Sequence, residues 1–266
     1  MIPVEIQQGQ GPIVLAVPHS GTYIPDDIFS QLSPLGQQLT DTDWHVNRLY
    51  EALLPDATIV RAGFHRYVID ANRDPSGASL YPGQNTTGLV PLTDFDGQRI
   101  WADTLDEDDI ASRLADWHTP YHAALDSELA RIRRKNGVAI LYDCHSIRSR
   151  IPHLFDGTLP DFNIGTNGTM SCAPEIERTV ADICEAATGY TTVINGRFKG
   201  GWTTRLYGRP DQNIHAIQME LAQSAYLTAE EPPFAYDEAK AARLREILKN
   251  ILETLSGLAP GLGGSS

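Results

Sequence analysis

The chain lacks a long hydrophobic run and a leader of the secretory type. No apolar stretch approaches the roughly 20 residues that cross a bilayer. The first residues, MIPVEIQQGQGPIV, carry neither a basic segment nor the long apolar stretch of a secretory signal. We therefore expect neither membrane insertion nor secretion.

Basic residues and cysteines are also scarce. The 21 lysines and arginines stand against 34 acidic residues, for a net charge of −13, so no basic stripe is available to neutralise phosphates and nucleic-acid binding is disfavoured. The three cysteines, Cys144, Cys172 and Cys184, are odd in number and scattered. That pattern argues against a disulfide framework and favours a reducing compartment, so we expect a cytoplasmic protein.

Short apolar runs rich in valine and isoleucine alternate with helical patterns. Strands are expected over residues 13–17, 58–63, 66–72, 138–146, 191–194 and 215–221, and helices over residues 43–53, 107–135, 175–187 and 244–255. Pro120 should kink or divide the second helix. The glycine- and proline-rich segment from Leu80 to Arg99 is expected to be a long loop, a candidate lid.

This alternation predicts the α/β class: a three-layer α/β/α sandwich with a central mixed, mostly parallel sheet. A chain of 266 residues with 41% hydrophobic content can fill one substantial core. We expect one domain over residues 1–258 and a flexible C-terminal tail over residues 259–266.

Polar side chains follow four of the expected strands. His19 comes after residues 13–17, Asn72 and Arg73 after the run YVIDA, His145 after AILYDC, and Glu220 near the end of HAIQMEL. Because ligands gather beyond the carboxyl ends of strands in such sheets, we expect these side chains to converge at one edge.

Two of these side chains are histidines, which zinc favours together with a carboxylate while an open position is kept for water. The segment DTDW offers Asp41 or Asp43 as third ligand, and Asp43 is preferred because Leu49 and Leu53 in the following pattern can pack on the sheet. A histidine after a strand is also a common hydrogen-bonding loop residue, so placement alone leaves both interpretations open.

Other candidate catalytic groups are weaker. His118 and His122 are four residues apart, as helical metal ligands are, but Pro120 lies between them and a structural role is favoured. Cys144 adjoins His145, yet neighbouring strand residues point to opposite faces, which favours a core thiol. Serine nucleophiles are disfavoured because the G-x-S-x-G elbow is absent. A metal-activated water is the preferred nucleophile.

Such a water needs a group that accepts its proton, and Glu220 is the candidate. A carboxylate in an apolar strand is either functional or a salt-bridged structural group, and both interpretations stay open. Arginines recur in the polar, glycine-rich segments, which suggests a small anionic substrate. They are Arg66, Arg73, Arg148, Arg150, Arg197, Arg205 and Arg209; Asn72–Arg73 is the best-placed pair.

Several segments together resemble one family over nearly the whole chain. They are VPHSGTYIP, DTDWHVNRLYE, HRYVIDANRDP, YDCHSIRSRIPHLFDG, LPDFNIGTN and HAIQMELAQSAYL. In order and joint presence they resemble the bacterial N-formylglutamate amidohydrolases.

The resemblance implies hydrolysis of N-formyl-L-glutamate to formate and L-glutamate, the final step of one histidine-degradation route. It also implies a fold like that of zinc carboxypeptidases and one Zn²⁺ per chain. His19, Asp43 and His145 fall on the metal positions and Glu220 on the base. The carboxypeptidase H-x-x-E ligand pair is absent, since His19 is followed by SGTY, so the third ligand rests on Asp43.

For the substrate, the resemblance places Asn72–Arg73 on a pair that grips a carboxylate. We expect Arg73 to be joined there by one or more of Arg148, Arg150 and Arg205. Two rival hypotheses remain: an amidohydrolase of another N-acyl amino acid, and a non-catalytic metal-binding relative. Oligomeric state does not follow from the sequence.

Overall fold

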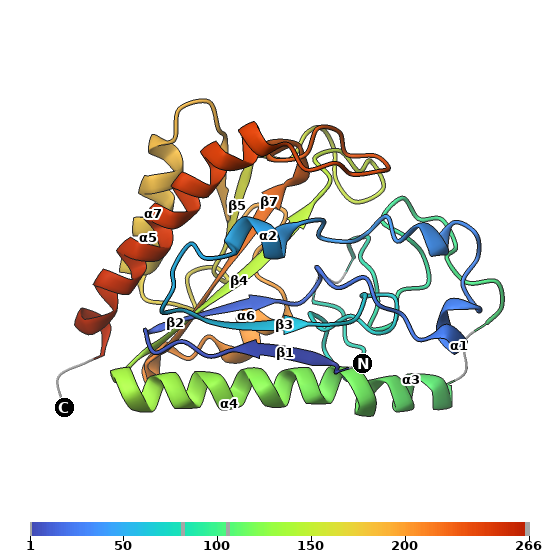
Figure 1. The fold of residues 1–266 in the computed structure, drawn as a ribbon, viewed down its shortest axis with the longest axis horizontal. Coiled ribbons are helices and arrows are strands. Elements are labelled where there is room, and N and C mark those ends of the chain that lie inside the picture. Colours follow the sequence, from blue (N-terminus) through green and yellow to red (C-terminus); the bar gives the residue numbers. More distant parts are fainter. Residues whose placement is uncertain (1, 81–82, 105–106, 264–266) are drawn as a thin grey trace.

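A mixed sheet runs through the middle of the molecule (Figure 1). The computed structural model describes residues 2–80, 83–104 and 107–263. Its strands are β1 (Val4–Gln7), β2 (Ile13–Val17), β3 (Thr58–Ala62), β4 (Ala139–Ile147), β5 (Phe162–Gly165), β6 (Thr192–Ile194) and β7 (Ile214–Ala222). They lie side by side in the order β1-β3-β2-β4-β7-β5-β6.

The strand directions confirm the expected fold class. Parallel pairing joins β3 to β2, β2 to β4, β4 to β7 and β5 to β6. Only the pairings of β1 with β3 and of β5 with β7 are antiparallel within the described residues. The sheet is therefore mixed and mostly parallel.

Helices cover both faces of the sheet. They are α1 (Asp26–Phe29), α2 (Val46–Tyr50), α3 (Glu107–Arg113), α4 (Thr119–Asn136), α5 (Pro174–Ala186), α6 (Trp202–Tyr207) and α7 (Glu238–Leu262). In Figure 1, the green α4 runs along one side of the sheet, and the red α7 lies with α5 on the other.

Two hydrophobic cores follow from the alternation of side chains along β2. Ile13, Leu15 and Val17 pack into the core that contains the buried faces of α2, α5 and α7. Val14 and Ala16 pack into the core that contains the buried face of α4. All five β2 side chains are buried because helices cover both faces, which is why the run is continuously apolar.

The long helical segment predicted over residues 107–135 is divided near Pro120, as expected. It consists of α3, a π-helical turn over Leu114–His118, and α4. Proline has no N–H to donate to the carbonyl four residues earlier, so the regular pattern is interrupted just before it.

The strand predicted over residues 66–72 is wrong. Val68 and Ile69 are fully buried, but the segment forms turns and pairs with no strand. Both edges of β3 are already occupied, by β1 and by β2, so this apolar run fills the core without joining the sheet. Conversely, β1 and β5 were not predicted: β1 is mostly exposed and β5 has only four residues.

The chain's end also differs from expectation. Helix α7 continues to Leu262 with Ala259 buried, so residues 259–262 are helical rather than part of a flexible tail. The last three residues of the predicted tail, 264–266, lie outside the described residues, as do residues 81–82 of the predicted loop. The rest of the Leu80–Arg99 segment carries no helix or regular strand, as predicted. No described helix is long and apolar enough to cross a membrane.

Candidate metal centre and active site

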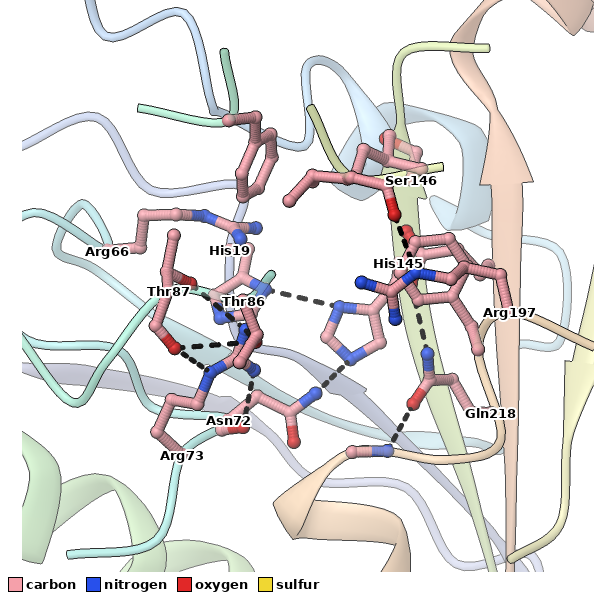
Figure 2. Close-up of a pocket in the computed structure, with 16 residues that line it drawn as sticks. His19, Arg66, Asn72, Arg73, Thr86, Thr87, His145, Ser146, Arg197 and Gln218 are labelled. Atoms are coloured by element: carbon pink, nitrogen blue, oxygen red, sulfur yellow. Dashed lines mark hydrogen bonds between the residues drawn. The ribbon is translucent and has the colours of Figure 1, made fainter. Parts of the chain in front are cut away.

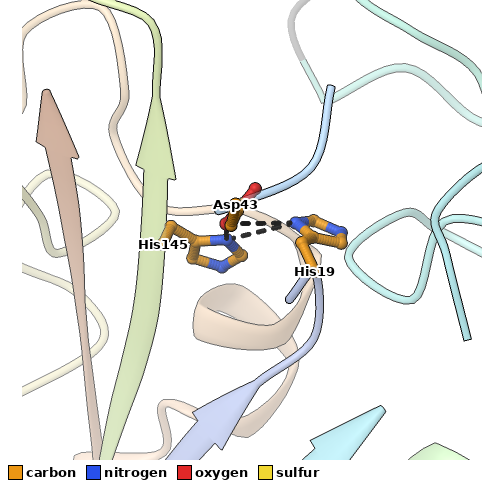
Figure 3. Close-up of side chains that lie close together, drawn as sticks. All are labelled: His19, Asp43 and His145. Carbon is orange, nitrogen blue, oxygen red and sulfur yellow. Dashed lines mark hydrogen bonds and ion pairs between the residues drawn. The ribbon is translucent and has the colours of Figure 1, made fainter. Parts of the chain in front are cut away.

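Three buried side chains from separate parts of the chain meet at one point (Figure 3). His19 Nδ1 lies 3.2 Å from His145 Nδ1 and 3.8 Å from Asp43 Oδ2. His145 Nδ1 lies 3.3 Å from the same carboxylate oxygen. The structure thus brings the predicted metal-binding residues together.

The donor set fits a divalent transition metal such as zinc. Two imidazole nitrogens and one carboxylate oxygen are ligands that zinc takes in catalytic sites, with bonds of about 2.0–2.2 Å. Donors at tetrahedral angles on such bonds are about 3.3 Å apart, close to the 3.2, 3.3 and 3.8 Å separations found. His19, Asp43 and His145 could therefore hold such an ion.

Each of these residues is positioned by the backbone. His19 lies two residues beyond β2, and His145 lies within β4 near its carboxyl end. Asp43 precedes α2, its N–H donates to the His19 carbonyl, and its Oδ2 accepts from the Ser146 N–H at 3.0 Å. These bonds connect the loop that carries Asp43 to both of the other two segments.

Of the two aspartates that the sequence offered, the structure brings only Asp43 to the histidines. Asp41 is equally buried, but its Oδ2 accepts from the Phe95 N–H at 3.0 Å. Burial raises the pKa of Asp41 to about 7. The Asp41 carboxyl group therefore holds the backbone of the loop that carries Phe95.

Carboxylates contact the outward nitrogens of both histidines. His19 Nε2 lies 2.7 Å from Asp70 Oδ1, and His145 Nε2 lies 3.0 Å from Asp143 Oδ1. The hydrogen bond between His19 Nε2 and Asp70 Oδ1 orients that imidazole and fixes which of its nitrogens carries the proton. Sequence reasoning missed Asp70 and Asp143, although each lies on a segment already singled out and two residues before a predicted site residue.

Opposing effects act on the pKa values of the two histidines. Burial lowers the pKa of His19, as does the charge of Arg66. Burial would also lower the pKa of His145, but Asp143 and Asp43 together raise it well above 6.5. The carboxylates thus favour positive charge at the point where the donor atoms converge.

Arg66 balances part of this negative charge. Its guanidinium pairs with Asp43 and lies 3.9 Å from Asp70 Oδ2, with only 5% of the residue exposed. Burial alone would raise the pKa of Asp43, but Arg66 and the two histidines hold it below the usual value. Arg66 therefore keeps Asp43 ionised, the form in which it can bind a metal.

Glu220 lies on β7 directly opposite His145 on the neighbouring β4. Its Oε2 accepts from the Gln218 side chain at 3.0 Å, and it lines the same pocket as both histidines. Burial raises the pKa of Glu220 to about 7, with the charge of His145 opposing and that of Asp43 adding to the effect. A carboxyl group with such a pKa can exchange protons near neutral pH.

The pocket around these groups contains two of the predicted substrate-binding residues (Figure 2). Asn72 and Arg73 line it, and Asn72 Nδ2 lies 3.0 Å from His145 Nε2. Arg73 donates to the Thr87 carbonyl at 2.9 Å and to the Thr87 hydroxyl at 3.0 Å. Part of the predicted lid segment therefore forms a wall of the pocket.

Three arginines predicted to bind substrate are not among the described residues that line the pocket. Arg148 pairs with Asp96, Arg150 is exposed, and Arg205 donates to the Gly200 carbonyl. The arginines among the described pocket residues are Arg66, Arg73 and Arg197. Spacing along the sequence could not distinguish the arginines that line the pocket from those that do not, because the paths of the loops after the strands decide which side chains point into it.

The apolar part of the pocket wall comes from the end of β4 and from loops. It includes Phe95, Ile147, Leu154 and Phe198. The space inside the pocket, including the part open to solvent, is about 590 Å³. It suits a small polar ligand more than a macromolecule.

The two alternative nucleophiles are placed unfavourably. Cys144 is buried in the core opposite to the pocket, and burial raises its thiol pKa well above 9.0. Ser146 lines the pocket, but its hydroxyl accepts from Tyr226 and no described histidine is bonded to it. Neither residue has the adjacent base that activates a nucleophile.

Comparison with known proteins gives a consistent result. The family model for N-formylglutamate amidohydrolase matches residues 11–227. The chain is 43% identical over 255 residues to an N-formylglutamate deformylase from Pseudomonas aeruginosa, and 44% identical over 255 residues to one from Pseudomonas putida. Each alignment covers 95% of this chain and 95% of the relative.

Solved structures agree with this. The fold is similar to the crystal structure of N-formylglutamate amidohydrolase from Ralstonia eutropha JMP134, with a TM-score of 0.81 and 25% sequence identity. That alignment covers 97% of this chain and 98% of the other. The chain belongs to the N-formylglutamate amidohydrolase family.

Proposed function

We propose that this protein is a zinc-dependent amidohydrolase that converts N-formyl-L-glutamate and water into formate and L-glutamate. The observation that carries the proposal is the convergence of His19, Asp43 and His145 beside the Glu220 carboxyl group in one pocket. The names of its relatives supply the substrate. The metal is proposed from the donor set.

His19, Asp43 and His145 would hold one zinc ion. When bound, zinc supplies a Lewis acid for the formyl carbonyl and makes a water molecule more acidic. Glu220 accepts the proton of the attacking water and then delivers it to the departing amine nitrogen. A pKa of about 7 suits both steps, because the carboxyl group must gain and lose the same proton in each turnover.

Arg66 would stabilise the negative charge that develops on the carbonyl oxygen. Its guanidinium is held in the pocket by Asp43 and Asp70, and its Nε has no hydrogen-bond partner in the described part of the protein. A fixed cationic donor in a water-poor site stabilises an oxyanion without reorganising during the reaction.

Asn72 and Arg73 would bind a carboxylate of the substrate. Arg73 donates to the Thr86 and Thr87 hydroxyl groups, so a carboxylate could replace them and form the stronger, charge-assisted pair. Arg197 also lines the pocket and is a candidate for the second carboxylate. Preference for the small formyl group would come from an acyl subsite that excludes larger groups, while the carboxylates supply the binding energy.

We further propose a cytoplasmic enzyme that serves histidine breakdown. The cysteines are all free, which fits a reducing compartment. Hydrolysis of N-formyl-L-glutamate would supply L-glutamate as the final product of such a route.

The test is an amidase assay on N-formyl-L-glutamate before and after chelation, followed by zinc addition. We expect activity to be lost on chelation and restored by zinc. N-acetyl-L-glutamate and N-formyl-L-aspartate serve as matched substrates, and faster hydrolysis of either would reassign the substrate. Inactivity of the zinc-replete protein on N-formyl-L-glutamate would overturn the proposal, and inactivity across N-acyl amino acids would favour a non-catalytic relative.

A further inference from the structure

The segment Ala71–Arg73 belongs to no helix or strand, although Ala71 and Asn72 are buried and Arg73 is half-buried. Its backbone carbonyls therefore receive no hydrogen bonds from a sheet or helix, and a buried carbonyl without a donor is costly. The Asn72 carbonyl accepts from Arg73 Nη1 at 3.1 Å. The carbonyls of Ala71 and Arg73, on either side of it, need donors from elsewhere.

His118, at the end of the π-helical turn, and His122, in α4, supply these donors. His122 Nε2 lies 2.8 Å from the Ala71 carbonyl oxygen, and His118 Nε2 lies 3.0 Å from that of Arg73. Their ring centroids are 4.4 Å apart. The pair therefore grips the backbone on both sides of Asn72.

Burial lowers the pKa of both rings, that of His122 to about 4 with a further contribution from His118. A neutral imidazole carries one N–H. In each ring that hydrogen is needed at Nε2, because a carbonyl oxygen can only accept.

The local helix geometry brings the two rings to this position. His118 ends the π-helical turn and His122 lies in the first turns of α4, with Pro120 between them. π-helical turns are rare and are often found at functional sites. From His118 to His122 the backbone is helical, and residues four apart lie on the same face of a helix, so both rings point toward the Ala71–Arg73 segment.

The side chain of Asn72 is held from the opposite side by α6. Thr203 N–H donates to Asn72 Oδ1 at 2.8 Å, and Tyr207 of the same helix contacts His122 Nδ1 through its hydroxyl at 3.1 Å. Helices α4 and α6 thus fix both the backbone and the amide of Asn72, whose Nδ2 faces His145.

We propose that His118 and His122 are positioning residues that hold Asn72 and Arg73 in the orientation that binds the substrate carboxylate. This inference rests on the proposed function of Asn72 and Arg73. Neither histidine lines the pocket among its described residues, so both act through the backbone that they hold.

The test compares variants that remove the donor with variants that keep it. His118→Leu and His122→Leu remove the N–H, whereas His118→Gln and His122→Gln offer an amide N–H at a similar reach. His215→Leu is the control, because His215 is a buried histidine that accepts from the Ala173 N–H away from the pocket. All variants are made in the full chain, loaded with zinc and assayed on N-formyl-L-glutamate.

We expect each leucine variant to raise KM by about fivefold to tenfold, in line with the loss of one hydrogen bond. The value of kcat should change less, because the loss affects substrate binding more than the reacting atoms. The glutamine variants should restore KM to within about twofold, and His215→Leu should leave it unchanged. Equal effects of leucine and glutamine, or an equal effect of His215→Leu, would overturn the inference.

A second measurement is independent of turnover. Hydrogen exchange at the amides of residues 71–73 should accelerate in the leucine variants and not in the glutamine variants. If the wild-type protein fails to hydrolyse the substrate, the proposed function is lost and the exchange rates decide whether the histidines hold this segment. Unchanged exchange in the leucine variants would overturn the positioning role.

Discussion

Replacing Glu220 by glutamine tests two properties of this carboxyl group in one variant. The residue is only 6% exposed, and its Oε2 accepts from the Gln218 amide. Glutamine has nearly the same shape but can neither ionise nor accept a proton. Glu220 is not among the three converging donors, so we expect the variant to bind zinc as the wild type does.

The substitution should change both kcat and the stability of the fold, and the size of each change can be worked out. Loss of a general base lowers kcat by about 10²- to 10⁴-fold. The folded-state pKa of about 7 lies above the usual 4.5, so the folded protein holds this proton more tightly than the unfolded chain. Ionisation of Glu220 therefore reduces stability as pH rises from about 4.5 to 7, by about 3 kcal/mol when complete. Glutamine removes that cost.

The assay pairs formate release by the zinc-loaded variant with urea unfolding of the metal-free protein. At pH 8.5 the free energy of unfolding should exceed that of the wild type by about 3 kcal/mol, and at pH 5.5 by about half of that or less. Glu128→Gln is the matched control, because buried Glu128 pairs with Arg131 and accepts from Gln8; it should be destabilised at both pH values. More than a tenth of wild-type kcat, or no gain in stability at pH 8.5, would refute the reasoning.

Three further predictions separate the parts of the site. Asp70→Asn should weaken zinc binding about 10- to 100-fold in a chelator competition, because the carboxylate that orients His19 is lost; unchanged affinity would contradict this. Arg150→Ala should leave the KM for N-formyl-L-glutamate unchanged, since the side chain is exposed outside the described pocket wall; a tenfold rise would return Arg150 to the site. Leu248→Ala, in the core that contains the buried face of α7, should lower the free energy of unfolding in urea by about 2–5 kcal/mol. It should leave kcat per bound zinc unchanged. A smaller loss of stability would mean that the core closes around the cavity.

The central strands were predictable because they leave an unambiguous pattern. The run that forms β2 is wholly apolar, and six of the nine residues in each of β4 and β7 are apolar, so the polar groups stand out against them. His19, His145 and Glu220 were found in this way. The rule that parallel strands end at one edge then predicted their convergence.

The parts of the site that lie on irregular segments were harder to predict from the sequence. The segment that carries Asn72 is as apolar as a strand, and its sequence does not reveal that β3 already has neighbours on both sides. Which arginines enter the pocket depends on loop paths, so Arg66 and Arg197 could not be separated from Arg148, Arg150 and Arg205 by composition. The choice of Asp43 over Asp41 likewise depends on the turn before α2.

The pairing of β4 with β7 sets the position of His145 relative to Glu220. His145 faces Glu220 across this pair, and their chain neighbours Cys144 and Met219 point into the opposite core. A shift of one strand by one residue would turn its apolar residues away from that core and move either the His145 imidazole or the Glu220 carboxyl group to the other face of the sheet. The hydrophobic cost of such a shift therefore fixes Glu220 beside His145. Asn72 and Arg73, the proposed substrate-binding residues, lie outside the sheet, so their position depends instead on the hydrogen bonds that His118, His122 and Thr203 make to this segment.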